Sequence, residues 1–276
     1  MKAIHNIHGI TKAMGMIATF RFKRAENRFS RSRNYFREME SMVSNLSAAA
    51  TDLKDPLFEA RKIKKKALVV MTGDKGLCGA YNSNLIKAAT VWMKENEAFS
   101  PVIIPVGKVM SEFCRKKQIA TILGYPEKAL ADLALAKKMT EELKTAFVSG
   151  QVDSIEILYA AYKAGTPGRN AQMPFLSLSY LMEKAAGEKN VIDYIYEPDF
   201  NTVFLTLVER YLEGKIYMTL LESLTSESSA RMLAMKQATD NAEDVLDNLK
   251  LQRNKTRQAT ITRELSEIVG GAAVLV

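Results

Sequence analysis

Proline is missing from both ends of the chain, and this distribution constrains the fold more than any other feature. All seven prolines lie from Pro56 to Pro198. Proline breaks a helix interior because it lacks the amide donor and its ring clashes with the preceding turn. The ends therefore predict two long helices, which at about 1.5 Å per residue could reach roughly 80 and 115 Å. We expect an N-terminal helix in residues 1–56, a middle domain in 67–198 and a C-terminal helix in 199–276.

Both ends carry apolar residues at the three- and four-residue spacing of a coiled coil. In the first helix we expect one stripe of five residues, which are Ala3, Ile7, Ile10, Met14 and Ile17. A second stripe begins at Phe22 on a rotated face and continues to Leu46. The last helix keeps one register from Leu207 to Leu249 and changes it near Arg253. The ends most simply pair as an antiparallel coiled coil.

The last residues of the chain carry an apolar stripe of their own. It consists of Ile261, Leu265, Ile268, Ala272 and Leu275, and residues 269–276 contain no charged side chain. Chain ends are usually polar and frayed. We therefore expect this end to enter an apolar socket.

The middle of the chain alternates between strand-like and helix-like segments. We expect strands at 67–71, 102–106, 155–162 and 175–180, and helices at about 83–97, 108–117 and 130–148. Alternation of this kind is typical of a parallel sheet with crossover helices. The predicted fold class is thus α/β, with a long coiled coil attached.

The net charge of +8 is concentrated at the start of the chain, where residues 1–66 carry fifteen basic and six acidic side chains. Four arginines follow one helical face beside the apolar stripe, namely Arg21, Arg24, Arg28 and Arg31. Such an arginine row is most often a solvated face, but it could also bind the phosphates of a nucleic acid or an acidic protein surface. The pattern alone leaves all three open.

Several functional classes are disfavoured by what the chain lacks. The sequence has no apolar run of membrane-spanning length. Its two histidines and two cysteines predict neither a zinc site nor a disulfide framework. The loop Gly73–Gly79 stands where a dinucleotide loop would, but its glycines have the wrong spacing and no Gly-Lys-Ser/Thr closes it. We expect no catalytic residue, cofactor or metal, and we interpret the loop as a turn or a partner contact.

Three motifs resemble one family closely. The segment Ile10–Ala18 resembles the N-terminal motif of the gamma subunit of F-type ATP synthase, and Gly76–Gly79 followed by Asn82 matches its middle-domain motif. The long C-terminal signature is matched from Ala230 to Ala273. The resemblance covers nearly the whole chain in the family's order.

The resemblance implies a fold and a role. The fold is an antiparallel coiled coil of the two ends with a Rossmann-like α/β middle domain that holds no nucleotide. The role is that of a non-catalytic central shaft, driven by the membrane c-subunit ring, which turns inside a ring of alpha and beta subunits during ATP synthesis and hydrogen ion transport. The resemblance also implies an epsilon subunit as partner and a peripheral position on the cytoplasmic face of a bacterial inner membrane.

Four residues match positions that contact the beta subunit in this family: Arg231, Gln258, Thr262 and Glu264. With the arginine row they complete the predicted partner contacts. One rival is an enzyme that uses the loop Gly73–Gly79, which nucleotide binding by the isolated chain would favour. The other is a basic helical hairpin that binds nucleic acid through the arginine row. Steeply salt-dependent binding to duplex DNA would favour that rival.

Overall fold

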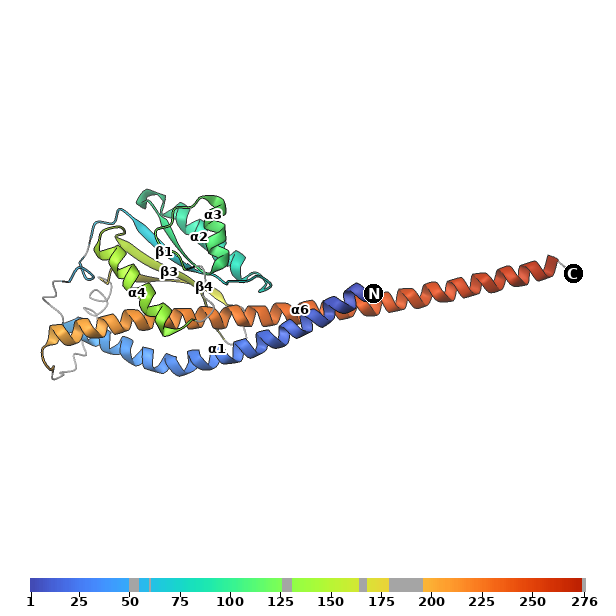
Figure 1. The fold of residues 1–276 in the computed structure, drawn as a ribbon, viewed down its shortest axis with the longest axis horizontal. Coiled ribbons are helices and arrows are strands. Elements are labelled where there is room, and N and C mark those ends of the chain that lie inside the picture. Colours follow the sequence, from blue (N-terminus) through green and yellow to red (C-terminus); the bar gives the residue numbers. More distant parts are fainter. Residues whose placement is uncertain (50–54, 60, 126–130, 164–167, 179–195, 275–276) are drawn as a thin grey trace.

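A computed structural model describes the chain apart from residues 50–54, 60, 126–130, 164–167, 179–195 and 275–276. The first long helix, α1, spans Lys2–Ala49, and the last, α6, spans Phe200–Val274. They run in opposite directions side by side, and an α/β domain lies against one side of the pair (Figure 1). The predicted antiparallel coiled coil and the α/β class are both confirmed.

The capping of α6 is visible in the structure. Asp199 lies just before the helix, and its carboxylate accepts hydrogen bonds from the backbone N–H and the hydroxyl of Thr202 at 3.0 and 2.7 Å. An acidic side chain at this position satisfies an unpaired helix donor and complements the positive end of the helix dipole. The helix then continues for 75 residues without a proline.

The seam of α1, meaning its positions that are shielded by packing, keeps a single register along the whole helix. Its members are Ile4, His8, Thr11, Gly15, Ala18, Phe22, Ala25, Phe29, Ser32, Phe36, Met39, Val43 and Leu46. Ile7, Ile10 and Ile17 are instead 52%, 59% and 56% exposed. Of the predicted first stripe only Met14 is half-buried, so that stripe is wrong for its other members, and the predicted register shift at Phe22 is wrong as well. Small and polar residues continue the seam because they face complementary positions of α6.

Direct contacts fix how the two helices are paired. The hydroxyl of Thr239 donates to that of Thr11 at 3.0 Å, and the rings of Phe36 and Tyr211 stack with centroids 5.7 Å apart. By this pairing α6 passes the start of α1 near Leu249. The rest of α6 projects alone, over roughly 40 Å at about 1.5 Å per residue (Figure 1).

The seam of α6 follows the predicted register. Its positions from Tyr211 to Leu249 are buried or half-buried at three- and four-residue spacing, and they include the small or polar members Gly214, Thr225, Ser228 and Thr239. A seam rich in small side chains lets two helix backbones approach closely. Side chains beyond residue 268 lie outside the described part, so the predicted apolar tail is not tested.

The middle domain contains one four-stranded sheet in the order β2-β1-β3-β4. The strands are β1 (Lys66–Met71), β2 (Val102–Val106), β3 (Ser154–Ala161) and β4 (Arg169–Leu176). The first three pair in parallel as predicted, but β4 pairs antiparallel with β3. The link between β3 and β4 is too short for a crossover, which explains the reversal. The strand predicted at 175–180 is placed too late: β4 ends at Leu176, residues 177 and 178 are not in a strand, and 179–180 lie outside the described part.

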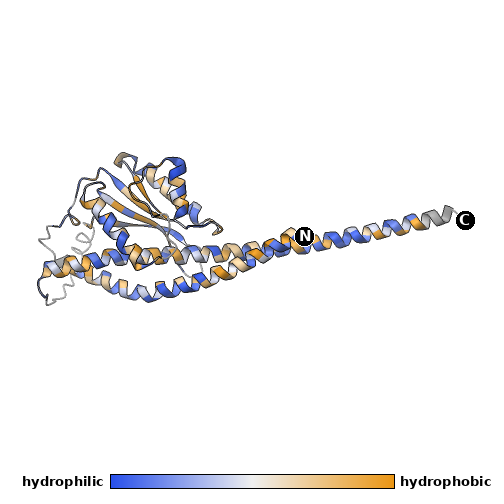
Figure 2. Cartoon of the chain, viewed as in Figure 1, coloured by the Kyte–Doolittle hydropathy of each residue, from blue (hydrophilic) through white to orange (hydrophobic). Residues whose placement is uncertain are grey.

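Helices cover both faces of this sheet. Helices α2 (Tyr81–Glu95) and α3 (Lys108–Lys117) pack on one face. A short 3-10 helix, η1 (Glu97–Phe99), follows α2. Helix α4 (Leu133–Val148) packs on the other face of the sheet together with the coiled coil. Figure 2 shows the apolar strands between these layers. The sheet therefore shares one of its two cores with the long helices, so the domain is fastened to the shaft along a broad apolar contact.

Candidate partner-contact surfaces

The carboxyl end of β3 is clamped to the coiled coil by aromatic and acidic side chains. The ring of Tyr162 lies 5.8 Å from that of Phe22 and 6.2 Å from that of Phe29, and its hydroxyl donates to Glu26 at 2.7 Å. The backbone N–H of Tyr162 donates to Glu222 of α6 at 3.0 Å. Burial raises the pKa of Glu222 above its ordinary value. This clamp joins the domain to both long helices.

A buried lysine makes a second attachment. The ammonium of Lys215 donates to the carbonyl of Pro174 at 2.8 Å and lies 5.4 Å from the ring centroid of Tyr211. Burial lowers the pKa of Lys215 to about 8. The attachment therefore joins α6 to β4 through an ammonium group that loses its proton more readily than an exposed lysine does.

The loop Gly73–Gly79 connects β1 to α2 and lies against α6. Gly73 is buried, and a Cβ built on it would come within 2.8 Å of the Glu227 carboxylate. Arg231 donates to the carbonyls of Lys75 and Gly76 at 3.2 and 3.4 Å. Side chains of α6 thus fill the place beside the first glycine where a dinucleotide loop would meet phosphate.

The arginine row is divided by the structure. Arg28 turns toward its own chain, where it donates to the carbonyl of Ala131 at 2.9 Å and to the hydroxyl of Tyr217 at 3.4 Å. Arg21, Arg24 and Arg31 are exposed. Three of the four predicted contacts are therefore open to a partner, whereas Arg28 ties α1 to α6 and to the domain.

The residues of the C-terminal signature also fall into two groups. Gln258, Thr262 and Glu264 are exposed on the part of α6 that projects beyond α1. The Arg231 side chain is only 13% exposed, because it lies between α6 and the loop Gly73–Gly79. Sequence matching placed these residues in one group, but the fold separates Arg231 from the others.

An apolar surface lies near the free end of the coiled coil, where the sequence predicted buried side chains. Ile7, Ile10, Ile17 and Phe20 form a distal stripe on α1, and Phe20 is 75% exposed. Further along the same end, α6 exposes Leu251, Ile261, Leu265 and Ile268 (Figure 2). Exposed apolar groups gathered like this mark interaction sites in soluble proteins. The signal was present as an apolar stripe but was assigned to the seam.

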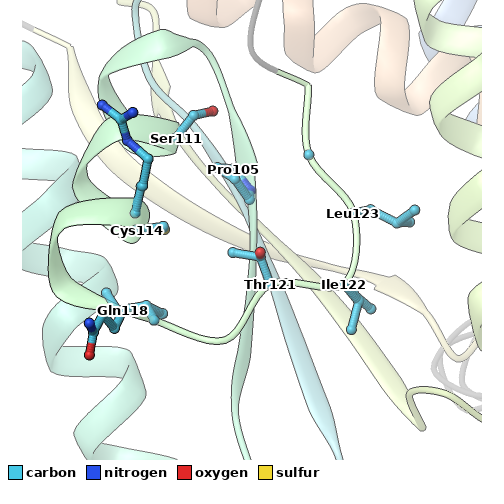
Figure 3. A pocket seen from close by; sticks show the side chains of 10 residues that line it. Pro105, Ser111, Cys114, Gln118, Thr121, Ile122 and Leu123 are labelled. Carbon is cyan, nitrogen blue, oxygen red and sulfur yellow. The ribbon is translucent and has the colours of Figure 1, made fainter.

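One surface hollow lies in the middle domain, away from these surfaces. It has a volume of about 560 Å³ and lies between α3 and residues 119–124, beside Pro105 (Figure 3). Proline cannot donate to a neighbouring strand, and the chain from residue 119 to 124 bulges away here. Cys114 lines the hollow but is buried, which raises the pKa of its thiol to about 11. The thiol is therefore protonated near neutral pH.

No group of three or more His, Cys, Asp or Glu side chains in the described part of the chain is placed to hold a metal ion. None of the helices in the same part combines the length and the apolar character needed to cross a membrane.

Comparison with known proteins gives one consistent answer. A family model described as ATP synthase matches residues 1–275. The ATP synthase gamma chain of Desulfitobacterium hafniense is 34% identical over 278 residues, which is 100% of this chain and 96% of that protein. The gamma chain of Methylobacillus flagellatus is 36% identical over 284 residues, covering 100% and 97%.

Solved structures agree at the level of the fold. A chain of the Tetrahymena thermophila mitochondrial ATP synthase central stalk and c-ring structure has a TM-score of 0.64 and 22% identity, covering 83% of this chain and 99% of that one. A chain of the Euglena gracilis mitochondrial ATP synthase rotor has a TM-score of 0.61 and 19% identity, covering 94% and 95%.

Proposed function

The chain belongs to the ATP synthase gamma-chain family, and we propose that it is the central rotor shaft of an F-type ATP synthase. In this role it couples proton-driven rotation of a membrane c ring to conformational change at the catalytic alpha and beta subunits. The observation that carries the proposal is the 75-residue α6, which pairs with α1 along part of its length and projects alone beyond it.

The shape supports this role physically. A shaft must be stiff along its axis, and two paired helices with a shared seam resist bending more than one. It must also be asymmetric to treat equivalent neighbours differently. Asymmetry comes from the middle domain on one side of the pair and from the unpaired end of α6 (Figure 1). It does not need the register shift that the sequence predicted.

Partner contacts are proposed at three places. The distal stripe of α1 and the projecting part of α6, with Gln258, Thr262 and Glu264, would lie inside the ring of alpha and beta subunits. Arg21, Arg24 and Arg31 would face acidic side chains of the beta subunit. The opposite end of the coiled coil would be attached to the c ring, with the epsilon subunit beside it.

The chain itself is proposed to be non-catalytic, with the chemistry at the beta subunits. Support comes from the loop Gly73–Gly79, where the Glu227 carboxylate occupies the space beside Gly73 and Arg231 binds the carbonyls of Lys75 and Gly76. We place the protein peripherally at the cytoplasmic face of a bacterial inner membrane, as a soluble part of a membrane complex. Proton transport would belong to the membrane subunits.

Co-purification tests the proposal directly. An affinity-tagged full-length chain, expressed in its own organism, should bring down alpha and beta subunits with ATPase activity. The matched preparation without the tag should bring down neither. Recovery of the chain without these subunits would contradict the shaft role.

The nucleic-acid-binding hairpin is not favoured. The family match covers residues 1–275, and Arg28 of the arginine row is turned toward Ala131 and Tyr217 of its own chain. Retention on duplex DNA that falls steeply with salt would reopen that alternative.

A further inference from the structure

We propose that Glu227 and Arg231 of α6 form a latch that fastens the loop Gly73–Gly79 to the shaft, so that the middle domain and the coiled coil turn as one body. Arg231 is then a positioning residue that acts within its own chain. The attachment lies at the carboxyl end of β1, which is one of the two inner strands of the sheet.

The first observation is the geometry of Arg231. One terminal nitrogen of its guanidinium donates to Glu227 at 2.8 Å, to the carbonyl of Lys75 at 3.2 Å and to that of Gly76 at 3.4 Å. The Nε atom also donates to Gly76 at 3.4 Å. A planar guanidinium suits such multiple donation, which lysine's single ammonium reproduces poorly. The loop is held by its backbone, so the attachment does not depend on the loop's side chains.

The second observation is burial. The side chains of Arg231 and Glu227 are 13% and 8% exposed. Arg263 and Glu267 have the same four-residue spacing on the projecting part of α6, but they are 73% and 71% exposed and 3.8 Å apart. Exposed pairs contribute little, whereas removing one partner of a buried pair leaves an uncompensated charge. The chain therefore contains a buried pair and its own exposed counterpart on one helix.

The third observation is that the loop is fitted around this pair. Gly73 gives the Glu227 carboxylate the space that any Cβ would occupy. The side-chain oxygen of Asn82 accepts from the N–H of Gly73 at 2.9 Å, and its amide donates to the carbonyl of Lys75 at 3.4 Å. The loop is thus held from α2 on one side and from α6 on the other.

The fourth observation is backbone strain. Leu77 has a φ of +61° while its side chain is 60% exposed. A non-glycine residue stays in the left-handed region only where the surroundings over-determine its conformation. The exposed side chain of Leu77 does not supply that constraint. That constraint comes instead from the hydrogen bonds that Arg231 donates to the carbonyls of Lys75 and Gly76, the two residues before Leu77.

Cys78 reports whether the latch is closed. This residue belongs to the loop itself and is 1% exposed. Burial raises the pKa of its thiol; the positive charge of Arg231 opposes the rise, and the negative charge of Glu227 adds to it. Loss of the Arg231 charge alone would therefore raise the pKa of Cys78 further. Opening of the loop would lower it toward the ordinary value, because burial is then relieved.

The experiment measures alkylation of Cys78 by iodoacetamide in the full-length chain, in a Cys114→Ser background that leaves one thiol. We expect Arg231→Ala and Glu227→Gln to raise the rate at least tenfold. The pH midpoint is diagnostic in Arg231→Ala, where opening should shift it downward; in Glu227→Gln loss of the carboxylate lowers the Cys78 pKa by itself, so only the rate is compared there. Arg231→Lys should give an intermediate rate. Arg263→Ala, the exposed counterpart, should leave rate and midpoint unchanged.

A second variant keeps the test decisive if Arg231→Ala does not fold. Gly73→Ala leaves both charges in place but pushes the Glu227 carboxylate out of its position, so it should raise the Cys78 rate as well. An unchanged rate in Gly73→Ala and in any folded variant of the pair would overturn the latch. An upward pH midpoint after Arg231→Ala would also overturn it, since that is the purely electrostatic effect.

The mechanical consequence rests on the proposed function and is measured separately. In purified complex, Glu227→Gln should lower proton-driven ATP synthesis several-fold relative to ATP hydrolysis, while Arg263→Ala leaves the ratio unchanged. If thiol labelling responds but the ratio does not, the loop is latched but does not carry torque, and that part of the inference is wrong. If the chain forms no complex with alpha and beta subunits, the shaft proposal itself fails.

Discussion

Two glycines within the coiled-coil seam should respond in opposite ways to the same substitution. Gly15 of α1 and Gly214 of α6 both lie inside long helices, so alanine relieves a similar helix-propensity penalty of about 1 kcal/mol at each. Their surroundings differ. A Cβ on Gly15 would lie 3.6 Å from the Cβ of Met235, an ordinary contact. A Cβ on Gly214 would lie 2.6 Å from the terminal methyl of Met39 and 3.1 Å from the ring of Phe36.

The magnitudes follow from these contacts. Gly15→Ala should raise the free energy of unfolding by about 1 kcal/mol, because the new methyl fits and removes backbone freedom from the unfolded chain. At Gly214 the Met39 methyl can move, but the Phe36 ring is stacked on Tyr211 and cannot move without losing that contact. Overpacking costs about 1–3 kcal/mol, so Gly214→Ala should be neutral or destabilising by up to about 2 kcal/mol.

Urea unfolding of the full-length variants, followed by far-ultraviolet circular dichroism, compares the two directly. We expect the Gly15→Ala protein to be more stable than the Gly214→Ala protein by about 1–3 kcal/mol, given the terms above. The midpoint of thermal unfolding should differ in the same direction, by at least about 2 °C. Equal stability of the two variants, or a more stable Gly214→Ala protein, would refute this account of the seam.

Four further predictions concern charge and the cysteines. Arg28→Ala should lower the free energy of unfolding by about 1–2 kcal/mol in urea, because it removes charged hydrogen bonds between elements. A variant in which the exposed Arg21, Arg24 and Arg31 are all replaced by alanine should assemble with near-normal stability. Its proton-driven ATP synthesis should be impaired. The native state releases the Lys215 proton near pH 8, before the unfolded chain does, so stability relative to Lys215→Met should rise between pH 8 and the ordinary lysine value; a flat difference would contradict this. Dithiothreitol should leave the ATPase rate of the complex unchanged, because Cys78 and Cys114 are both buried, and a response lost in the double serine variant would contradict it.

Local patterns were enough for much of the fold. The absence of proline predicted both long helices, and the register from Tyr211 to Leu249 was visible in the sequence because α6 offers one consistent strip. Strands β1 and β2 were predicted because short apolar runs between turn residues form buried parallel strands. Each of these features depends on neighbours along the chain.

The site residues divide along the same line. The motifs marked Gln258, Thr262 and Glu264, and the structure leaves them exposed where a partner could meet them. The motifs also marked Arg231, but no local pattern could tell that its guanidinium meets carbonyls more than 150 positions away in sequence. The clamp of Tyr162 on Glu26 was unseen for the same reason.

The sequence by itself determined the long helices, the α/β alternation and the positions of the motifs, because helix and strand periodicity are properties of consecutive residues. Only the tertiary structure decided which strip of α1 faces its partner. The apolar strip of Ile7, Ile10 and Ile17 is more hydrophobic than the seam that contains Thr11 and Gly15. The seam with Thr11 and Gly15 nevertheless faces α6, because close packing depends on the shapes of both surfaces. Thr239 and Met235 of α6 leave room there only for small side chains. The more hydrophobic strip therefore faces outward, so residues that the sequence predicted to be in the core form a surface that a partner could bind.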